Sequence, residues 1–257
     1  MASIISPKAE VSPKAKIGDN CKIYPFVYIE DDVVIGDNCT IYPFVSIMNG
    51  TRMGKNNKVF QAAVIAALPQ DFNFTGEESE VVIGDNNTIR ENVVINRGTH
   101  QGGKTVLGNN NFLMEGAHIS HDTVIGNGCV FGYGTKIAGD CVIGNGVIYS
   151  TSVVENAKTR VGDLSMFQAG TTFSKDIPPY IIAGKEPTRY CSINLIGLRR
   201  RGFSNETIQN IHEAYRLLYS KGILKEGIEE IKKNLEVTKE IQYIIDFVES
   251  SQRGIIR

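Results

Sequence analysis

The sequence is poor in tryptophan, histidine and cysteine, and its positive and negative charges nearly balance. It contains no tryptophan, only four histidines and five cysteines, and no two cysteines form a C-x-x-C pair. An odd number of cysteines without zinc-type spacing favours free thiols in a reducing compartment, so we expect a cytoplasmic protein. The net charge of −1 gives no overall attraction to nucleic acid.

Targeting and membrane segments are also lacking. The first residues include no basic stretch followed by an apolar core, so we expect no secretory signal. No run approaches the roughly 18 apolar residues of a membrane-spanning helix, so we expect no stable membrane insertion. A hydrophobic content of 42% with 21% charged residues is ordinary for a globular protein.

The chain does contain a repeat of six residues. Every sixth position from Ile5 to Phe173 gives 29 positions, of which 25 are apolar, whereas the overall composition would give about 12. Interruptions near 66–80 and 98–105 predict two loops. The exceptions to the pattern are Asp71, Glu77, Gln101 and Glu155.

A second, smaller residue accompanies each large apolar one. It stands two positions earlier, and residues two apart in a strand face the same side. Four cysteines occupy this small position, which predicts that they pack inside the protein rather than react. Glycine often follows the large position, and we expect it to supply a positive φ at turns. The pattern is typical of a hexapeptide β-helix. The four cysteines are Cys21, Cys39, Cys129 and Cys141.

Proteins with this repeat form left-handed parallel β-helices in which three hexapeptides make each triangular coil. The resemblance implies a mainly β fold with about ten coils and a β-helix domain over residues 1–185. For residues 186–257 we expect a small α-helical domain. Ser204 and Thr238 are predicted helix N-caps and Gly222 a predicted C-cap, and apolar residues recur at helical spacing over 208–218 and 241–248.

The segment 117–122 carries the residues best suited to chemistry. His121 precedes Asp122, and a carboxylate beside an imidazole can fix its tautomer and make it a general base. Gly139 follows His121 by one coil length, so its backbone N–H is expected beside the base, where it would serve an oxyanion. Two alternatives remain at this point. The histidines can be surface residues that hydrogen-bond along the coils, or His100, His118 and His121 can hold a zinc ion.

The whole chain resembles the acyl-carrier-protein–UDP-N-acetylglucosamine O-acyltransferase family, which begins lipid A synthesis in Gram-negative bacteria. The resemblance is most specific in the basic stretch after the repeats. The matching stretches are Pro69–Asp71, Ile89–Asn92, Arg97–Thr99, Gln101–Gly103, Ala117–Asp122, Asp176–Tyr180, Asn194–Phe203 and Arg253–Arg257.

This resemblance implies a role for each matching residue. His121 is the general base, Asp122 orients it, and the Gly139 N–H stabilises the oxyanion. His118 helps to place the sugar or the acyl chain. Asn194 and Arg200 would contact the nucleotide bound to a neighbouring subunit. Arg199 and Arg201 are alternatively contacts for the acidic carrier protein. The full set of further substrate-binding positions is Gln70, Asp71, Asn156, Ala169, Asn194, Arg200 and Arg201.

The implied partners follow from the same family. They are acyl carrier protein, which bears the 3-hydroxyacyl donor on its phosphopantetheine, and UDP-N-acetylglucosamine, with the chain assembled as a homotrimer. No other cofactor, no metal and no nucleic acid are implied.

Several positions depart from the family pattern. Asn73 replaces a frequent phosphate-facing lysine, Asp140 and Asn156 each replace a histidine, and Ile196 replaces a carboxylate. Ala169 lies where the family limits acyl length, and Glu155 puts a carboxyl group at an inward position, which is costly unless it is paired. These departures leave open a related acyltransferase that acts on another nucleotide amino sugar, and a non-catalytic trimeric scaffold.

Overall fold

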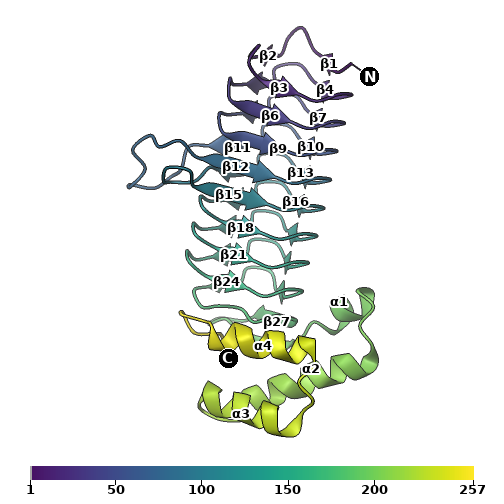
Figure 1. The fold of residues 1–257 in the computed structure, drawn as a ribbon, viewed down its shortest axis with the longest axis vertical. Helices are drawn as coiled ribbons and strands as arrows, with labels where there is room; N and C mark the ends of the chain where they lie inside the picture. The colour runs from purple at the N-terminus through teal and green to yellow at the C-terminus, as the bar shows by residue number, and fades with distance from the viewer. Residues whose placement is uncertain (1) are drawn as a thin grey trace.

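The computed structural model describes residues 2–257 as a triangular column of short parallel strands with helices at one end (Figure 1). Three sheets, here called A, B and C, form the sides of the column, and each coil adds one strand to each sheet. Strands one coil apart pair in register, so that Ile5 lies beside Ile23, the residue three repeats later.

Most of the strands contain only two residues. Sheet A consists of β1 (Ile4–Ile5), β4 (Lys22–Ile23), β7 (Thr40–Ile41), β10 (Lys58–Val59), β13 (Thr88–Ile89), β16 (Phe112–Leu113), β19 (Val130–Phe131), β22 (Ile148–Tyr149), β25 (Met166–Phe167), β27 (Ile181–Gly184) and β28 (Arg189–Ile193). Sheet B consists of β2 (Glu10–Val11), β5 (Tyr28–Ile29), β8 (Ser46–Ile47), β11 (Val64–Ala67), β14 (Val94–Asn96), β17 (His118–Ile119), β20 (Lys136–Ile137), β23 (Val154–Glu155) and β26 (Thr172–Phe173). Sheet C consists of β3 (Lys16–Ile17), β6 (Val33–Ile35), β9 (Thr51–Met53), β12 (Glu80–Ile83), β15 (Lys104–Leu107), β18 (Val124–Ile125), β21 (Val142–Ile143) and β24 (Arg160–Val161).

The core fills the interior of the column. Every apolar residue of the six-residue repeat from Ile23 onward is buried, and so are the four cysteines at the small position. The thiol of Cys39 donates to the carbonyl oxygen of Gly54 at 3.2 Å, and burial raises its pKa to about 11. The prediction that these cysteines are packing residues is confirmed.

The glycines of the repeat have a different role from the one expected. A Cβ on Gly36 would lie 2.7 Å from the carbonyl carbon of Gly54 in the next coil, so glycine is required because two backbones approach closely. The positive φ falls two residues later, at Asn38 (φ 60°), and at its counterparts in other coils. Asparagine tolerates this conformation better than most residues.

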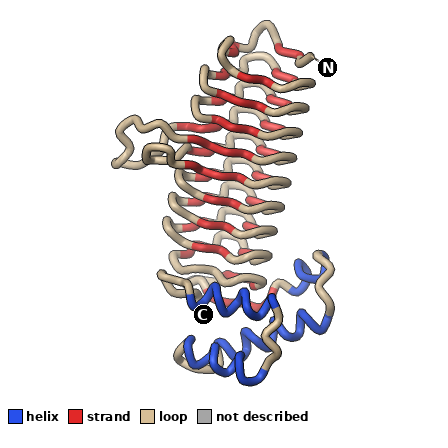
Figure 2. The backbone as a smooth tube through the Cα atoms, viewed as in Figure 1, coloured by secondary structure: helices blue, strands red, loops and turns tan. Residues whose placement is uncertain are grey.

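After the last coil the chain forms a hairpin and then the helices that lie at the end of the column (Figure 2). Strand β28 pairs antiparallel with β27, and the suggested boundary between residues 185 and 186 lies in the turn that joins them. The sequence did not predict β28. The helices are α1 (Leu195–Arg200), α2 (Asn205–Leu218), α3 (Leu224–Asn234) and α4 (Lys239–Glu249).

The helix-end predictions were partly right. Ser204 is the N-cap of α2, because its hydroxyl accepts from the Thr207 N–H at 3.0 Å. Thr238 precedes α4 but forms no such bond. Gly222 was wrong as a C-cap, since α2 ends at Leu218 with Tyr219 as its cap. None of the helices within residues 2–257 has the length and apolar character needed to cross a membrane.

Two loops project from the column between a strand of sheet B and the next strand of sheet C, an edge called here the B–C corner (Figure 1). They comprise residues 68–79, between β11 and β12, and 97–103, between β14 and β15. Both agree with the interruptions in the sequence repeat.

Glu155 is buried in the column, with 1% of its surface exposed. Its carboxyl group accepts from the Tyr149 hydroxyl at 2.6 Å and from the Thr159 hydroxyl at 2.8 Å. Tyr149 is itself one of the large inward residues of the repeat. The hydrogen-bond partner of Glu155, an exception to the repeat, therefore comes from a regular position of the same repeat. Burial nevertheless disfavours the anion and raises the pKa of Glu155 to about 7.

This raised pKa predicts that the protein loses stability as the pH rises. The usual pKa is 4.5, so between about pH 4.5 and 7 the unfolded chain releases a proton that the folded protein keeps. The expected loss of unfolding free energy across this window is about 3 kcal/mol. Denaturant titrations at several pH values measure it. Glu155→Gln should remove this part of the pH dependence, and an unchanged slope in that variant would contradict the assignment.

Candidate active site

The B–C corner gathers most of the candidate residues from different coils. His121 and Asp122 follow β17, Gly139 follows β20, and Asn156 follows β23, each in the turn toward sheet C. Gln70 and Asp71 belong to the loop that projects from the same corner. The fold thus brings together residues that lie up to 86 positions apart in the sequence (from 70 to 156).

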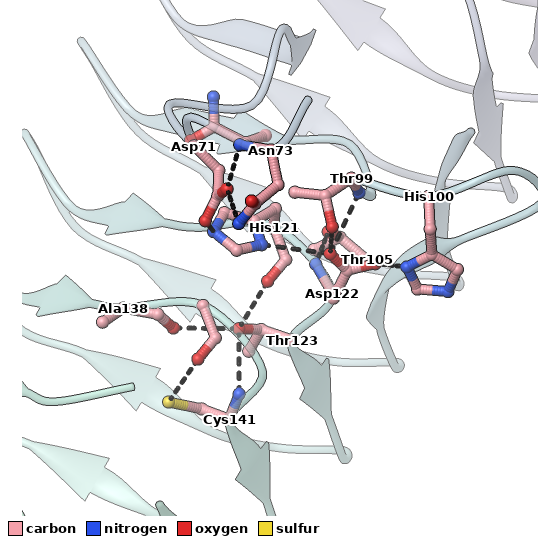
Figure 3. Close-up of polar contacts among 12 residues, drawn as sticks. Asp71, Asn73, Thr99, His100, Thr105, His121, Asp122, Thr123, Ala138 and Cys141 are labelled. Carbon is pink, nitrogen blue, oxygen red and sulfur yellow. Dashed lines mark hydrogen bonds and ion pairs between the residues drawn. The ribbon is translucent and has the colours of Figure 1, made fainter. Parts of the chain in front are cut away.

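His121 and Asp122 form a hydrogen-bonded pair (Figure 3). The His121 Nδ1 lies 3.0 Å from Asp122 Oδ2, and both side chains are largely buried, with exposed fractions of 13% and 7%. The same Oδ2 accepts from the Thr99 N–H at 2.9 Å and the Thr99 hydroxyl at 2.7 Å. A carboxylate only accepts hydrogen bonds, so in the neutral imidazole Nδ1 carries the proton and Nε2 has the lone pair.

Asp122 reaches this position through an unusual backbone conformation. Its φ is 57°, and its backbone N–H donates to the Thr105 hydroxyl at 2.9 Å. Aspartate is among the few residues that tolerate the left-handed region. The turn therefore directs the carboxylate toward the 97–103 loop, where Thr99 donates hydrogen bonds to it.

Gly139 lies against the His121 ring, as the coil spacing predicts. A Cβ on Gly139 would overlap the imidazole, so only glycine fits beside it. The neighbouring amides of Ala138 and Asp140 donate to the carbonyl groups of Glu155 and His121. Within residues 2–257, the Gly139 N–H has no such acceptor. This amide is therefore available to a developing negative charge.

Asp71 approaches the other side of the imidazole. Its Oδ2 lies 3.6 Å from His121 Nε2, the nitrogen with the free lone pair. Its Oδ1 accepts from the Asn73 N–H at 2.8 Å and from the Asn73 amide at 2.9 Å. These bonds, the backbone one first, lower the pKa of Asp71. Asn73, a departure from the family pattern, thus fixes Asp71.

His118 points outward from β17 and is held by a different group. Its Nε2 lies 2.7 Å from Asn96 Oδ1, and the Asn96 amide donates to the Leu68 carbonyl at 2.7 Å. His118 is therefore tied to the start of the 68–79 loop. Burial, with a smaller contribution from the charge of Lys136, lowers the pKa of His118.

The remaining candidates do not contact the His121–Asp122 pair in this chain. Ala169 is exposed between sheets A and B, and Asn156 and Gln70 are exposed on the B–C corner. Asn194 is buried, where its side chain accepts from the Gly197 N–H and donates to the Leu164 carbonyl. A Cβ on Gly128 would lie 3.3 Å from the Arg201 guanidinium, at the corner between sheets C and A. Arg200 ends α1 and is exposed.

Sequence reasoning missed Thr99, Thr105 and Asn96. Thr99 stands in a matching stretch, but its contact with Asp122 does not span the three repeats of one regular coil. The loop at 97–103 breaks the coil count, so spacing alone did not reveal these partners. Within residues 2–257, no group of three or more His, Cys, Asp or Glu residues is arranged to hold a metal ion.

Comparison with known proteins first defines the class. Residues 14–49 and 104–139 match the model of the bacterial transferase hexapeptide family. With the parallel coils, this confirms the predicted fold class, a mainly β left-handed β-helix of hexapeptide repeats. The chain is a hexapeptide-repeat transferase.

More specific matches identify the family. Residues 176–256 match the model described as UDP N-acetylglucosamine O-acyltransferase, domain 2. The chain is 46% identical to the acyl-[acyl-carrier-protein]–UDP-N-acetylglucosamine O-acyltransferase of Sulfurihydrogenibium sp., over 98% of this chain and 93% of that protein. The crystal structure of the UDP-N-acetylglucosamine acyltransferase of Bacteroides fragilis superimposes with a TM-score of 0.96 at 54% identity, covering 99% and 100% of the two chains. That of Francisella novicida gives 0.95 at 39% identity, covering 99% and 94%. This chain belongs to the acyl-[acyl-carrier-protein]–UDP-N-acetylglucosamine O-acyltransferase family.

The environment of His118 predicts its titration. Its imidazole resonances should titrate below the usual value of 6.5, because burial disfavours the cation. With only four histidines, NMR spectra between about pH 5 and 8 can follow each ring. Lys136→Gln removes the smaller, electrostatic cause and should raise the midpoint only partly. A midpoint at or above 6.5 in the unmodified protein would contradict the described burial.

Proposed function

We infer that this protein transfers a 3-hydroxyacyl chain from acyl carrier protein to the 3-hydroxyl of UDP-N-acetylglucosamine, the first step of lipid A biosynthesis. Membership of the family supports this reaction. The observation that carries it is the buried His121–Asp122 pair beside the Gly139 N–H, which has no acceptor within residues 2–257. A non-catalytic scaffold has no need for this arrangement.

The proposed reaction begins with removal of a proton. His121 Nε2, whose lone pair is free, takes the proton of the sugar 3-hydroxyl as that oxygen attacks the thioester carbonyl carbon. Asp122 Oδ2 stabilises the resulting imidazolium through Nδ1. The two Thr99 donors hold that oxygen in place.

The second half of the reaction expels the thiol. The carbonyl oxygen of the tetrahedral intermediate becomes negative and accepts from the Gly139 N–H. The carbon–sulfur bond then breaks, and the phosphopantetheine sulfur leaves with the proton held on His121. The ester and the free carrier thiol are the products, and His121 returns to its neutral form. This chemistry uses only protein groups and the two substrates.

We propose that the chain forms a homotrimer, and the positions of the candidate binding residues support a site shared between two chains. His121, Asp71, Gln70 and Asn156 lie on the B–C corner, whereas Arg201 lies at the corner between sheets C and A. A nucleotide held by both groups requires a second chain, which presents its own C–A corner to the first. We propose that Arg200 and Arg201 of the neighbouring subunit contact the diphosphate or the acidic carrier protein, because arginine forms two charge-assisted bonds to phosphate.

The remaining assignments are narrower. We propose that His118 and Asp71 contact the sugar, that Asn194 shapes the nucleotide pocket by fixing the start of α1, and that Ala169 limits the acyl chain. The free cysteines fit a reducing cytoplasm. Asn73, which replaces the frequent lysine and donates to Asp71, favours a test with other nucleotide amino sugars as acceptors.

Replacement of the general base should abolish most activity. The purified protein is mixed with UDP-N-acetylglucosamine and 3-hydroxyacyl carrier proteins of different lengths, and the acylated sugar is followed by mass. His121→Ala should lower turnover by about 10²- to 10⁴-fold. His212→Ala, an exposed histidine on α2, is the matched control and should retain full activity. Equal rates in both variants would refute the proposed base.

Gly139 provides a second test. Gly139→Ala places a methyl group in the His121 ring and should lower kcat by about 10²- to 10³-fold, because base and oxyanion donor are both displaced. Gly222→Ala is the control, since a Cβ there meets no atom within 4 Å. Thermal melting tests whether both variants fold. An active Gly139→Ala protein would exclude the assigned oxyanion site.

A further inference from the structure

The two oxygens of the Asp122 carboxylate have unequal surroundings. Oδ2 accepts from His121 and from both donors of Thr99. Oδ1 is buried and, within residues 2–257, has no hydrogen-bond partner. A buried carboxylate oxygen without a donor is costly, so this oxygen calls for a specific partner.

Two glycines and one histidine lie around Oδ1. A Cβ on Gly98 would lie 2.7 Å from Oδ1 and one on Gly103 would lie 2.9 Å from it, so these two glycines close the pocket at backbone distance. The remaining neighbour is His100, whose Nδ1 lies 3.4 Å from Oδ1. This distance exceeds that of an ordinary N–H···O bond, so the proposed contact requires a rotation of the exposed side chain toward Oδ1.

The 97–103 loop places His100 for this contact. The Gly103 N–H donates to the His100 carbonyl at 2.8 Å and closes a tight turn that begins beside Thr99. In Figure 3, His100 and His121 lie on opposite sides of Asp122. The His100 side chain is 70% exposed.

We propose that His100 is a positioning residue for the reaction, donating its Nδ1–H to Asp122 Oδ1 so that one carboxylate is shared by two imidazoles. This inference rests on the proposed function. The added bond stops rotation of the carboxylate and keeps Oδ2 aligned with His121 Nδ1. It also withdraws charge from Oδ2, so His121 holds a proton less tightly.

The charges around this pair set the expected pH effect. His121 faces Asp122 and Asp71, and Lys158, in the turn after β23, acts electrostatically on Asp71. A protonated His100 adds a positive charge on the far side of Asp122. Since histidine changes charge between about pH 5 and 8, this charge opposes protonation of His121 and extends its activity to lower pH.

The test compares three variants across the pH range. His100→Ala should lower kcat about 3- to 10-fold, the contribution of one hydrogen bond, with the KM for the sugar nucleotide unchanged. The acidic limb of its kcat/KM profile should move up by about 0.5 pH unit. His100→Asn puts an amide nitrogen close to the place of Nδ1, so kcat should recover while the acidic limb stays shifted. His212→Ala should match the unmodified protein.

Contrary outcomes are distinct. An unchanged kcat and pH profile in His100→Ala overturns the proposal, and a raised KM with unchanged kcat makes His100 a substrate contact instead. If the unmodified protein transfers no acyl chain to any acceptor, the proposed function fails. NMR titration of His121 then still decides the contact, since its midpoint must rise in His100→Ala, and an unmoved midpoint overturns the proposal.

Discussion

The structure depends on hydrogen bonding between one coil and the next. Each strand is too short to be stable alone, so its backbone groups are satisfied by the coils above and below. This pairing stacks equivalent residues of successive coils above one another, such as Val94, His118 and Lys136 on sheet B. The candidate site is one such stack of residues at the B–C corner. Its precision comes from the register of the backbone and not from long secondary-structure elements.

The same register explains what the sequence revealed. Because inward positions recur with the hexapeptide period, the column and its buried cysteines followed from the pattern, and the contact of Gly139 with His121 followed from a spacing of one coil. Where loops intervene, the spacing grows beyond three repeats, as it does between the paired residues Thr51 and Val81 and again between Val81 and Thr105. The contacts of Thr99 and His100 with Asp122 therefore could not be predicted from the repeat spacing. Strand β28 and the end of α2 lie beyond the repeat, where only short local signals are present.

Glu155 shows how the repeat accommodates an exception. A carboxyl group at an inward position of the repeat is unfavourable by itself, but the hydroxyl groups of Tyr149 and Thr159 each donate a hydrogen bond to it. The sequence contains all three residues, yet none predicts the contact alone, because they become neighbours only when the chain turns inside the coil. Buried polar groups of this kind tend to be retained together, since losing one partner leaves another unsatisfied.

The stacked coils also give the molecule a discrete scale of length. The B–C corner that holds His121 and the helices after β28 are fixed to the same column, and neighbouring strands lie about 4.8 Å apart. Inserting or deleting residues within a turn changes a loop, as residues 68–79 do, without moving either end. Only the addition or removal of a whole coil of three repeats changes the distance along the column between His121 and the helices. The distance between the B–C corner that holds His121 and the helical end therefore changes only in whole coils, and any related chain that alters it must add or remove full layers.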